Sequence, residues 1–493
     1  MPQTVIGWTL TVLGAVAGYE LVRHAVVSGA RRRLREGALA FTRRHNIRLD
    51  SARFIDRAWL REQLLLDSEI DHALVASAEE QGLPPAVLRP RVELYIDEIV
   101  PAFSLTAYYR VAAVLARGIS TFAYEVVFDR AEVDRAVAQV PPGAVAVYVI
   151  NHRSNADFVV LTYGLLRHVA LSYAVGEWAR VWPLDALFRA FGGYFVRRGE
   201  KDRLYHKVLE RYVQRILAKG GVTGFFIEGG LSRDGRLRPP KAGLLDYMIG
   251  LQRENAGREI AFIPVGINYD RVLEDRHLLA EAGGRKARPT LLDKGASALK
   301  LLLRLPVLIG ANLVKVALRS HRKLGYAAIS VGSPVLLSTL CGGDPVCRLP
   351  EEERRLRVKE IAERLLESVA EQIPATPVPV FCLALLQDED RGDRAVLERI
   401  RRTLAALRDA GASLAFGLAF PRLNEARSTI PGLEDEVEGE NEAEMVLTLA
   451  GFALERRGLL SHRAGAFHVE RDGEEVLKYY ARSIEHHLGR SGR

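Results

Sequence analysis

The sequence predicts an α/β fold, in which a central mixed sheet is flanked by helices. Between residues 141 and 350, short runs rich in β-branched and aromatic residues alternate with amphipathic stretches, which is typical of an α/β sheet. The segments on either side show the apolar periodicity of helices. The predicted domains are a helical unit over 31–140, an α/β domain over 141–350 and a mainly helical region with a terminal β-hairpin over 351–493.

The composition is that of a globular protein in a reducing compartment. The 493 residues carry a net charge of +8 and are 48% hydrophobic, which excludes a disordered chain and a polytopic membrane protein. The three cysteines belong to no C-x-x-C pair, which argues against disulfides and structural zinc. We therefore expect no metal and no cofactor. The positive charge favours anionic partners, such as phosphorylated substrates, acidic lipid or nucleic acid.

An apolar segment over residues 1–22 opens the chain. Arg23 and a triplet of arginines at 31–33 follow it. At about 18 residues the apolar run is short for a bilayer span of ~20, so a single anchor and a helix lying in the interface both remain open. If the run spans the bilayer, the arginines place the rest of the chain in the cytoplasm. We expect attachment to the cytoplasmic face of the cell membrane.

A second membrane contact is expected at 299–318. This stretch is strongly apolar, but it contains three basic residues and is interrupted by Pro306 and Gly310. The interruptions disfavour a span and favour a basic amphipathic segment on an anionic membrane surface. A buried pair of helices is the alternative.

Six short apolar runs define the predicted sheet. They are 144–150, 171–175, 194–196, 223–227, 260–265 and 326–331. After them we expect an acidic solvated loop over 434–444, a helix over 443–457, a hairpin that turns at Asp472-Gly473 and a helix over 474–488. Because open α/β sheets bind ligands beyond the carboxyl ends of their strands, the polar residues that follow the strands are candidates for a site.

The first strand ends in a turn that contains His152 and Asp157. On a regular helix, residues five apart lie roughly 140° from each other. The two side chains can therefore meet only if His152 precedes the helix, with Ser154 or Asn155 as the N-cap. Asp157 can then accept the imidazole Nδ1–H and leave Nε2 as a general base.

Other residues at strand ends have weaker signals. His45 and Asp50 repeat the same spacing without a preceding strand, and we assign them to the surface. Arg197 and Arg198 follow a strand, and on an extended backbone they face opposite ways, so one of them is expected to reach the site. Pro264 predicts a sheet edge or the end of its strand.

A glycine-containing turn follows the strand at 223–227. Glu228 and Gly229 begin this turn, and Ser232 and Arg233 continue it. Its backbone N–H groups can contact an oxyanion or a phosphate, with the guanidinium beside them.

In this order, the four blocks resemble the four motifs of the glycerolipid acyltransferase superfamily, in the branch of glycerol-3-phosphate and dihydroxyacetone-phosphate acyltransferases. NHRSNADF is similar to the H-x4-D block and GGYFVRR to the G-x-x-F-x-R-R block. FIEGGLSRDGRLRPPKAGLL is similar to the third block and FIPVGINYDRV to the fourth, which contains a proline. The match covers residues 144–275, and the helical N-terminal region and the closing LKYYARSIEHHL also resemble this branch. The resemblance implies the acyltransferase fold.

The resemblance also implies roles for single residues. His152 is similar to the catalytic base and Asp157 to its partner. Leu231 departs from the pattern, because many members of the superfamily carry Arg there, and one potential phosphate contact is thereby lost. The implied substrate-binding residues are Arg197 and Arg198 for the acceptor phosphate, Glu228 and Gly229 for the acceptor, Ser232 and Arg233 in the same block, and Pro264 in the block linked to acyl-donor binding.

The expected reaction is transfer of a fatty acyl group from acyl-CoA or acyl carrier protein to the sn-1 hydroxyl of glycerol 3-phosphate. His152 takes the hydroxyl proton, and Arg153 or the region of Gly229 is a candidate for stabilising the oxyanion. Dihydroxyacetone phosphate and lysophosphatidate, acylated at sn-2, remain alternative acceptors. A non-catalytic membrane lipid-binding protein is the alternative from another class. Nucleic-acid binding is disfavoured, because the C-terminal hairpin carries acidic residues that phosphate would repel.

Overall fold

The computed structural model describes residues 57–101, 118, 123–165, 172–176, 193–197, 199–253, 258–282, 323–343, 346–415 and 442–489. Several predictions lie outside these residues: the apolar segment 1–22, the pair His45 and Asp50, Arg198, the segment 299–318 and the part of the acidic run before residue 442. No helix within the described ranges combines the length and the hydropathy needed to cross a bilayer.

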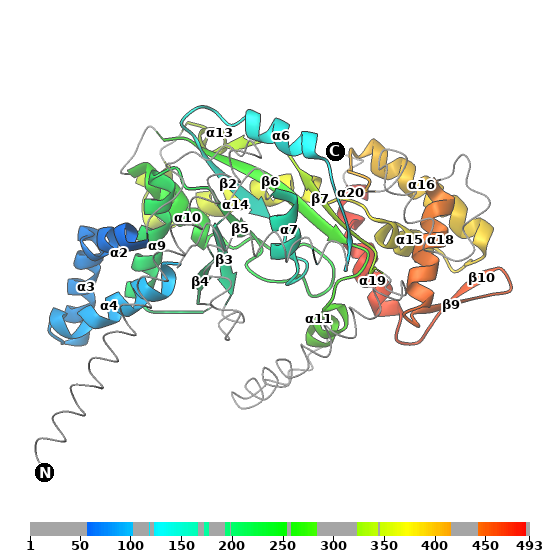
Figure 1. Cartoon of the computed structure of the whole chain (residues 1–493), viewed down its shortest axis with the longest axis horizontal. Coiled ribbons are helices and arrows are strands. Elements are labelled where there is room, and N and C mark those ends of the chain that lie inside the picture. Colours follow the sequence, from blue (N-terminus) through cyan, green and yellow to red (C-terminus); the bar gives the residue numbers. More distant parts are fainter. Residues whose placement is uncertain are drawn as a thin grey trace, which may run out of the picture.

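Among the described residues, a mixed sheet of eight strands forms the centre of the molecule, and Figure 1 shows its central strands between the flanking helices. Its order is β1-β7-β6-β2-β5-β3-β4, and β8 pairs with β6. The strands from β6 to β4 in this order are parallel, whereas β7 is antiparallel to β6. The predicted mixed α/β sheet is confirmed. The strands are β1 (Glu125–Phe128), β2 (Val145–Ile150), β3 (Ser172–Gly176), β4 (Tyr194–Val196), β5 (Thr223–Phe226), β6 (Ile260–Tyr269), β7 (Tyr326–Val331) and β8 (Val335–Leu336).

Helices cover both faces of this sheet, and its central strands are therefore buried on both sides. On β2, Val147 and Val149 enter one hydrophobic core, and Tyr148 and Ile150 enter the other, as the alternation of side chains along a strand requires. The first core includes α2 (Arg57–Leu65), α3 (Ser68–Gln81), α4 (Pro85–Ile99), α9 (Arg203–Ala218), α10 (Gly243–Gly250), α13 (Leu337–Cys341) and α14 (Glu351–Glu371). The second includes α6 (Arg130–Ala138), α7 (Asp157–Leu165), α11 (Asp275–Ala282), α15 (Pro377–Leu385), α16 (Asp393–Asp409), α18 (Glu442–Glu455) and α19 (Glu474–Arg482).

The sheet layer extends past both predicted limits of the α/β domain. β1 lies within the predicted helical unit 31–140, yet it pairs in parallel with β7. α14 begins the predicted C-terminal region 351–493, yet it packs on β2 and β6. In Figure 1 the helices α2, α3 and α4 lie at one end of the sheet, and the helices α15, α16, α18 and α19 lie at the other. The limits at 141 and 350 therefore divide one layered unit.

Pro264 lies in the middle of the sheet, and the prediction of an edge or a strand end was wrong. β6 continues to Tyr269, between β2 and β7. On one side of β6, β8 pairs with Phe262 and β7 pairs from Val265 onward. Pro264 faces the turn between those two strands, where its carbonyl accepts from Gly332 N (2.9 Å). Since the amide and carbonyl of one strand residue point to the same side, no partner strand needs the missing N–H.

The C-terminal hairpin turns earlier than predicted. β9 (Leu460–Arg463) and β10 (Ala466–Val469) are joined by Ala464 and Gly465, whose φ angles are 51° and 73°. Two consecutive residues with positive φ match the right-handed twist of a tight hairpin. Asp472-Gly473, the predicted turn, instead leads into α19, which is followed by α20 (Glu485–Leu488).

Candidate active site

His152 and Asp157 lie where β2 passes into α7, at the carboxyl end of a central strand (Figure 1). Asn151 secures this end of β2, because its Nδ2 donates to the Ile267 carbonyl (2.9 Å) and its Oδ1 accepts from Ile267 N (2.8 Å). Asp157 is the first residue of α7. The His152 Nδ1 lies 2.9 Å from Asp157 Oδ2, so the structure brings together the two side chains that the sequence pairs.

Four donors hold the Asp157 carboxylate. Oδ2 accepts from His152 Nδ1, from Arg153 N (2.7 Å) and from Ser154 N (3.1 Å). Oδ1 accepts from the Tyr269 hydroxyl at 2.7 Å. Asp157 is fully buried, where an ionised carboxylate requires such donors. Because a carboxylate only accepts, Nδ1 is the protonated nitrogen of His152 and Nε2 carries the lone pair.

The imidazole of His152 is held in place by its neighbours, but part of it remains exposed to solvent. Its ring stacks on the Phe226 ring, with the centroids 3.9 Å apart and the planes at 15°. The side chain is 10% exposed. Within the described part of the chain, Nε2 has no hydrogen-bond partner. This arrangement leaves Nε2 as the proton acceptor of the pair.

Glu228 ties the third sequence block to the His152 turn. Its Oε1 accepts from His152 N and its Oε2 accepts from Arg238 N, each at 2.8 Å. Glu228 is 1% exposed. Burial raises the pKa of its carboxyl, although the charge of Arg153 and the two N–H groups oppose this rise. Because backbone N–H groups from two segments bind its two oxygens, Glu228 holds the His152 turn against the third block.

Gly229 and Arg233 lie on the exposed rim of this block. Gly229 has a φ of 61°, and a Cβ there would lie 2.7 Å from Lys241 Cγ, so the stem of Lys241 packs against the turn. Arg233 Nε lies 3.3 Å from Glu281 Oε2, and its side chain is 51% exposed. Exposed pairs of this kind are weak, so an anionic ligand can replace Glu281 at Arg233.

Arg153 and Ser232 are buried supports of the site. Ser232 N donates to the His152 carbonyl (3.1 Å). Arg153, expected to stabilise an oxyanion, is 1% exposed. Its Nη2 donates to the Ser483 carbonyl (3.2 Å), and its Nη1 donates to the Gly235 carbonyl. The guanidinium therefore joins the His152 turn to the third block and to the residue that follows α19.

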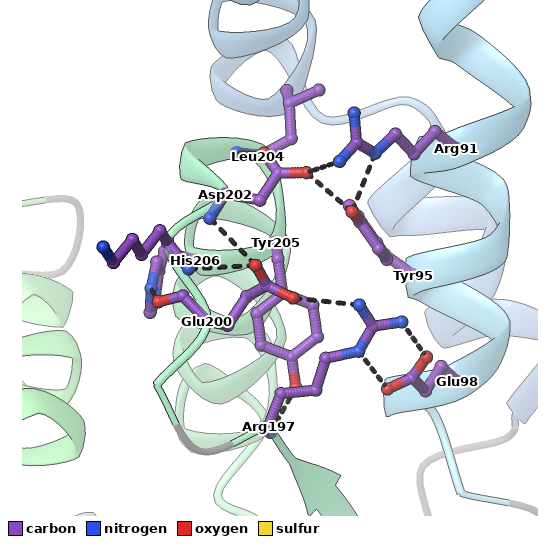
Figure 2. Close-up of polar contacts among 10 residues, drawn as sticks. Arg91, Tyr95, Glu98, Arg197, Glu200, Asp202, Leu204, Tyr205 and His206 are labelled. Atoms are coloured by element: carbon purple, nitrogen blue, oxygen red, sulfur yellow. Dashed lines mark hydrogen bonds and ion pairs between the residues drawn. The ribbon is translucent and has the colours of Figure 1, made fainter.

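Arg197 faces the N-terminal helices. It follows β4, which is three strands from β2 in the sheet order, a separation of about 14 Å at ~4.8 Å per strand. Glu98 of α4 and Glu200 bind its guanidinium (Figure 2). Arg198, its neighbour in the same block, lies outside the described residues.

Two residues at the site were not predicted. Tyr269 ends β6, and the alternation along that strand places it in the same core as α7, so the pattern contained a signal for it. Glu274 accepts from Ser154 Oγ (2.8 Å) and from Asn155 N (3.3 Å). No local pattern marks Glu274, because its partners lie about 120 residues earlier in the chain.

Comparison with known proteins assigns this region to a class. Residues 134–268 match the family model described as Acyltransferase. This range contains the His152 turn, the end of β4, the third block and Pro264. The match to this family covers residues 134–268, and the resemblance predicted from the four blocks is confirmed.

The individual relatives are glycerol-3-phosphate acyltransferases. The protein of that name from Pseudomonas syringae pv. syringae (strain B728a) is 28% identical over 352 residues, which are 68% of this chain and 39% of that protein. The one from Aeromonas hydrophila subsp. hydrophila is 29% identical over 356 residues, 68% of this chain and 40% of its own. This chain thus spans about two fifths of the length of these relatives.

A solved structure, the 1-acyl-sn-glycerophosphate (LPA) acyltransferase PlsC from Thermotoga maritima, is similar over 53% of this chain and 79% of its own, at 19% identity and a TM-score of 0.29. A superposition this loose carries no argument about the site.

Proposed function

We propose that this protein transfers a fatty acyl group from acyl-CoA or acyl carrier protein to the sn-1 hydroxyl of glycerol 3-phosphate, the first acylation of phospholipid synthesis. The observation that carries the proposal is the buried contact between His152 and Asp157 at the end of β2, which leaves Nε2 as a base. The family domain supports acyl transfer. The names of the curated relatives support glycerol 3-phosphate as the acceptor.

His152 acts as the general base in this mechanism. Its Nε2 takes the proton of the sn-1 hydroxyl while the oxygen attacks the thioester carbonyl. Collapse of the tetrahedral intermediate breaks the C–S bond, the imidazolium returns its proton to the thiolate, and lysophosphatidate and the free thiol are formed. Asp157 orients the ring and stabilises the imidazolium through Nδ1–H. Positioned acid–base catalysis of this kind contributes about 10²–10⁴-fold.

In this proposal the acceptor phosphate binds to exposed basic side chains near the His152 turn. Arg233 and Lys241 are both exposed beside the Gly229 turn. Arg198 of the second block is the further candidate. Charge-assisted hydrogen bonds from such side chains supply most of the binding of a small dianion, because glycerol 3-phosphate has little apolar surface to bury.

The first prediction concerns the base. His152→Ala should abolish transfer with every donor and leave the thermal melt intact, and Asp157→Asn should keep only a small residual rate because the ring loses its orientation. His468→Ala, an exposed histidine in the terminal hairpin, is the control and should keep full activity. Turnover near that of the wild type in His152→Ala would rule out this mechanism.

A matrix of substrates identifies the reaction. Acyl-CoA and acyl carrier protein are each assayed with glycerol 3-phosphate, dihydroxyacetone phosphate and lysophosphatidate, and we expect the highest kcat/KM with glycerol 3-phosphate. A preference for lysophosphatidate would replace the sn-1 reaction by the sn-2 reaction. A folded protein that transfers no acyl group in any combination would favour the alternative of a non-catalytic lipid-binding protein.

We also propose that the protein works on the cytoplasmic face of an anionic cell membrane. The apolar segment 1–22 and the arginines after it support this placement. Deletion of 1–22 should reduce co-sedimentation with anionic vesicles without abolishing it, because 299–318 is expected to be a second contact. Complete release of the truncated protein would show that 299–318 does not bind the membrane.

A further inference from the structure

The guanidinium of Arg197 is bound by the N-terminal helices. Figure 2 shows it against α4, where Nε donates to Glu98 Oε1 (2.9 Å) and Nη2 donates to Glu98 Oε2 (2.7 Å). This two-point contact is the favoured geometry between a guanidinium and a carboxylate. Nη1 donates to Glu200 Oε2 at 2.9 Å. Each nitrogen of the guanidinium therefore already donates to a carboxylate.

Aromatic rings enclose the same group. The Arg197 Cζ lies 5.1 Å from the ring centroid of Tyr95 and 5.2 Å from that of Tyr205, within the range of cation–π attraction. The Tyr205 hydroxyl accepts from Arg197 N (3.0 Å) and so secures the end of β4. The side chains of Arg197 and Glu98 are only 24% and 6% exposed, so water and salt screen their attraction less than on an open surface.

The charge around Arg197 disfavours a further anion. The hydrogen bond to Glu98, opposed by burial and assisted by Glu200, raises the pKa of Arg197. Arg197 in turn lowers the pKa of Glu200. One guanidinium thus faces two carboxylates. A phosphate dianion would be repelled by both, and it would have to compete with the buried Glu98 for the guanidinium.

A second group of contacts secures the same junction. The Tyr95 hydroxyl donates to Asp202 Oδ2 (2.6 Å), and Arg91 Nη2 lies 2.8 Å from the same oxygen. Asp202 is also the N-cap of α9, where its Oδ1 accepts from Leu204 N (2.9 Å). Through these contacts, also visible in Figure 2, α4 binds both the residue that follows β4 and the N-cap of α9.

We propose that Arg197 is a positioning residue: with Glu98 as its partner it docks the helical unit α2–α4 on the end of β4, and it does not bind the acceptor phosphate. The statement about the phosphate rests on the proposed acylation of glycerol 3-phosphate, whereas the docking role does not. The phosphate is then held by basic side chains nearer the His152 turn.

Exchange of the two charges tests the docking role. Thermal melts of Glu98→Arg and Arg197→Glu should each show a lower Tm, because like charges then face each other. The double variant should recover at least half of the summed loss, since it restores an opposite pair. Glu93→Gln, on the exposed side of α4, is the control and should melt like the wild type. Losses that simply add in the double variant would overturn the proposal.

Variants that remove one charge each separate docking from phosphate binding. If docking is the role, Arg197→Gln and Glu98→Gln break the same contact, and each should change the KM for glycerol 3-phosphate by the same factor, about threefold or less. A phosphate ligand would behave differently: Arg197→Gln would raise that KM about 30-fold or more, and Glu98→Gln would leave it unchanged or lower it. That result would overturn the proposal. Should the wild type fail to acylate glycerol 3-phosphate, the proposed function falls, while the melts still decide the docking role.

Discussion

At the scale of the residue, Tyr269 is the side chain outside the turn that contacts the pair of His152 and Asp157. Its hydroxyl donates to Asp157 Oδ1, the oxygen opposite the one that accepts from His152. Burial, together with the charge of Asp157, raises the pKa of Tyr269 well above its ordinary value of 10. The hydroxyl therefore stays protonated and remains a donor at physiological pH.

Tyr269→Phe should lower kcat about tenfold and change the KM of neither substrate. A hydrogen bond to a buried charge contributes about 1.5–3 kcal/mol, and tenfold in rate corresponds to about 1.4 kcal/mol. The effect falls on kcat because Asp157 matters most when the imidazolium forms. Steady-state kinetics with both substrates varied measure this split.

Tyr124→Phe is the matched control for that variant. The Tyr124 ring centroid lies 5.3 Å from that of Tyr269, but its hydroxyl donates to the Arg271 carbonyl (2.7 Å). Its loss should reduce stability and leave kcat unchanged. Equal values of kcat in the two variants would show that the contact with Asp157 has no part in the rate.

At the scale of the element, the loop between β5 and α10 is shaped by its contact with α19. Gly235 has a φ of 91°, and a Cβ there would lie 1.9 Å from the Tyr479 carbonyl oxygen. The position thus needs glycine for two reasons, a left-handed backbone and the close approach of a distant helix. The same loop donates from Ser232 N to the His152 carbonyl, so the path of the loop also affects the His152 turn.

Gly235→Ala should destabilise the protein more than Gly143→Ala. Gly143 has a similar φ of 81°, but nothing lies within 4 Å of its Cβ position. Gly143→Ala therefore measures only the cost of placing a side chain on a left-handed backbone, which is about 1–2 kcal/mol. The clash at Gly235 should add about 1–3 kcal/mol and lower activity as well. Urea unfolding of the two variants gives the comparison, and equal losses would mean that α19 simply moves aside.

At the scale of the whole molecule, the closing segment of the chain is built into the site. Asn268 of β6 donates to Ser483 Oγ (3.2 Å), and Arg153 donates to the Ser483 carbonyl (3.2 Å). The Tyr480 hydroxyl of α19 donates to Asp275 Oδ2 (2.6 Å). Residues that follow the strands of the α/β sheet in sequence therefore bind the His152 turn, through Arg153, and the neighbouring strand β6, through Asn268.

Arg153→Met should reduce the free energy of unfolding by about 3 kcal/mol and lower kcat. The variant loses two hydrogen bonds from a buried cation, each worth about 1.5–3 kcal/mol, and keeps part of the packing. Arg236→Met is the control, because Arg236 Nη2 also bridges to the closing segment, at Glu485 Oε2 (3.1 Å), but both side chains are more than half exposed. Its loss should cost about 0–1 kcal/mol. Denaturant unfolding and turnover numbers check both, and similar losses would contradict the buried link.

Local patterns determined the class of fold and the core of the site. The predicted strands at 194–196 and 326–331 match β4 and β7 to the residue, and the others lie within a few residues of the observed limits. This agreement arises because a strand buried on both faces must be a short apolar run between turns. His152 and Asp157 were predictable for the same kind of reason, since a turn and a helix N-terminus connect them within six residues.

Only the tertiary structure decided which partners the long polar side chains take. Arg153 and Arg197 have nothing in their local sequence that shows whether they face a substrate, yet one is buried against Ser483 and the other is bound by Glu98. The fold also decided that Pro264 could lie in a central strand, because the break between β7 and β8 falls beside it. The physical reason is the same in all three cases. A strand or helix pattern repeats within a few residues, so the local sequence contains it. The partners of a guanidinium, and the strands that lie beside a proline, come from distant segments that meet only when the chain has packed.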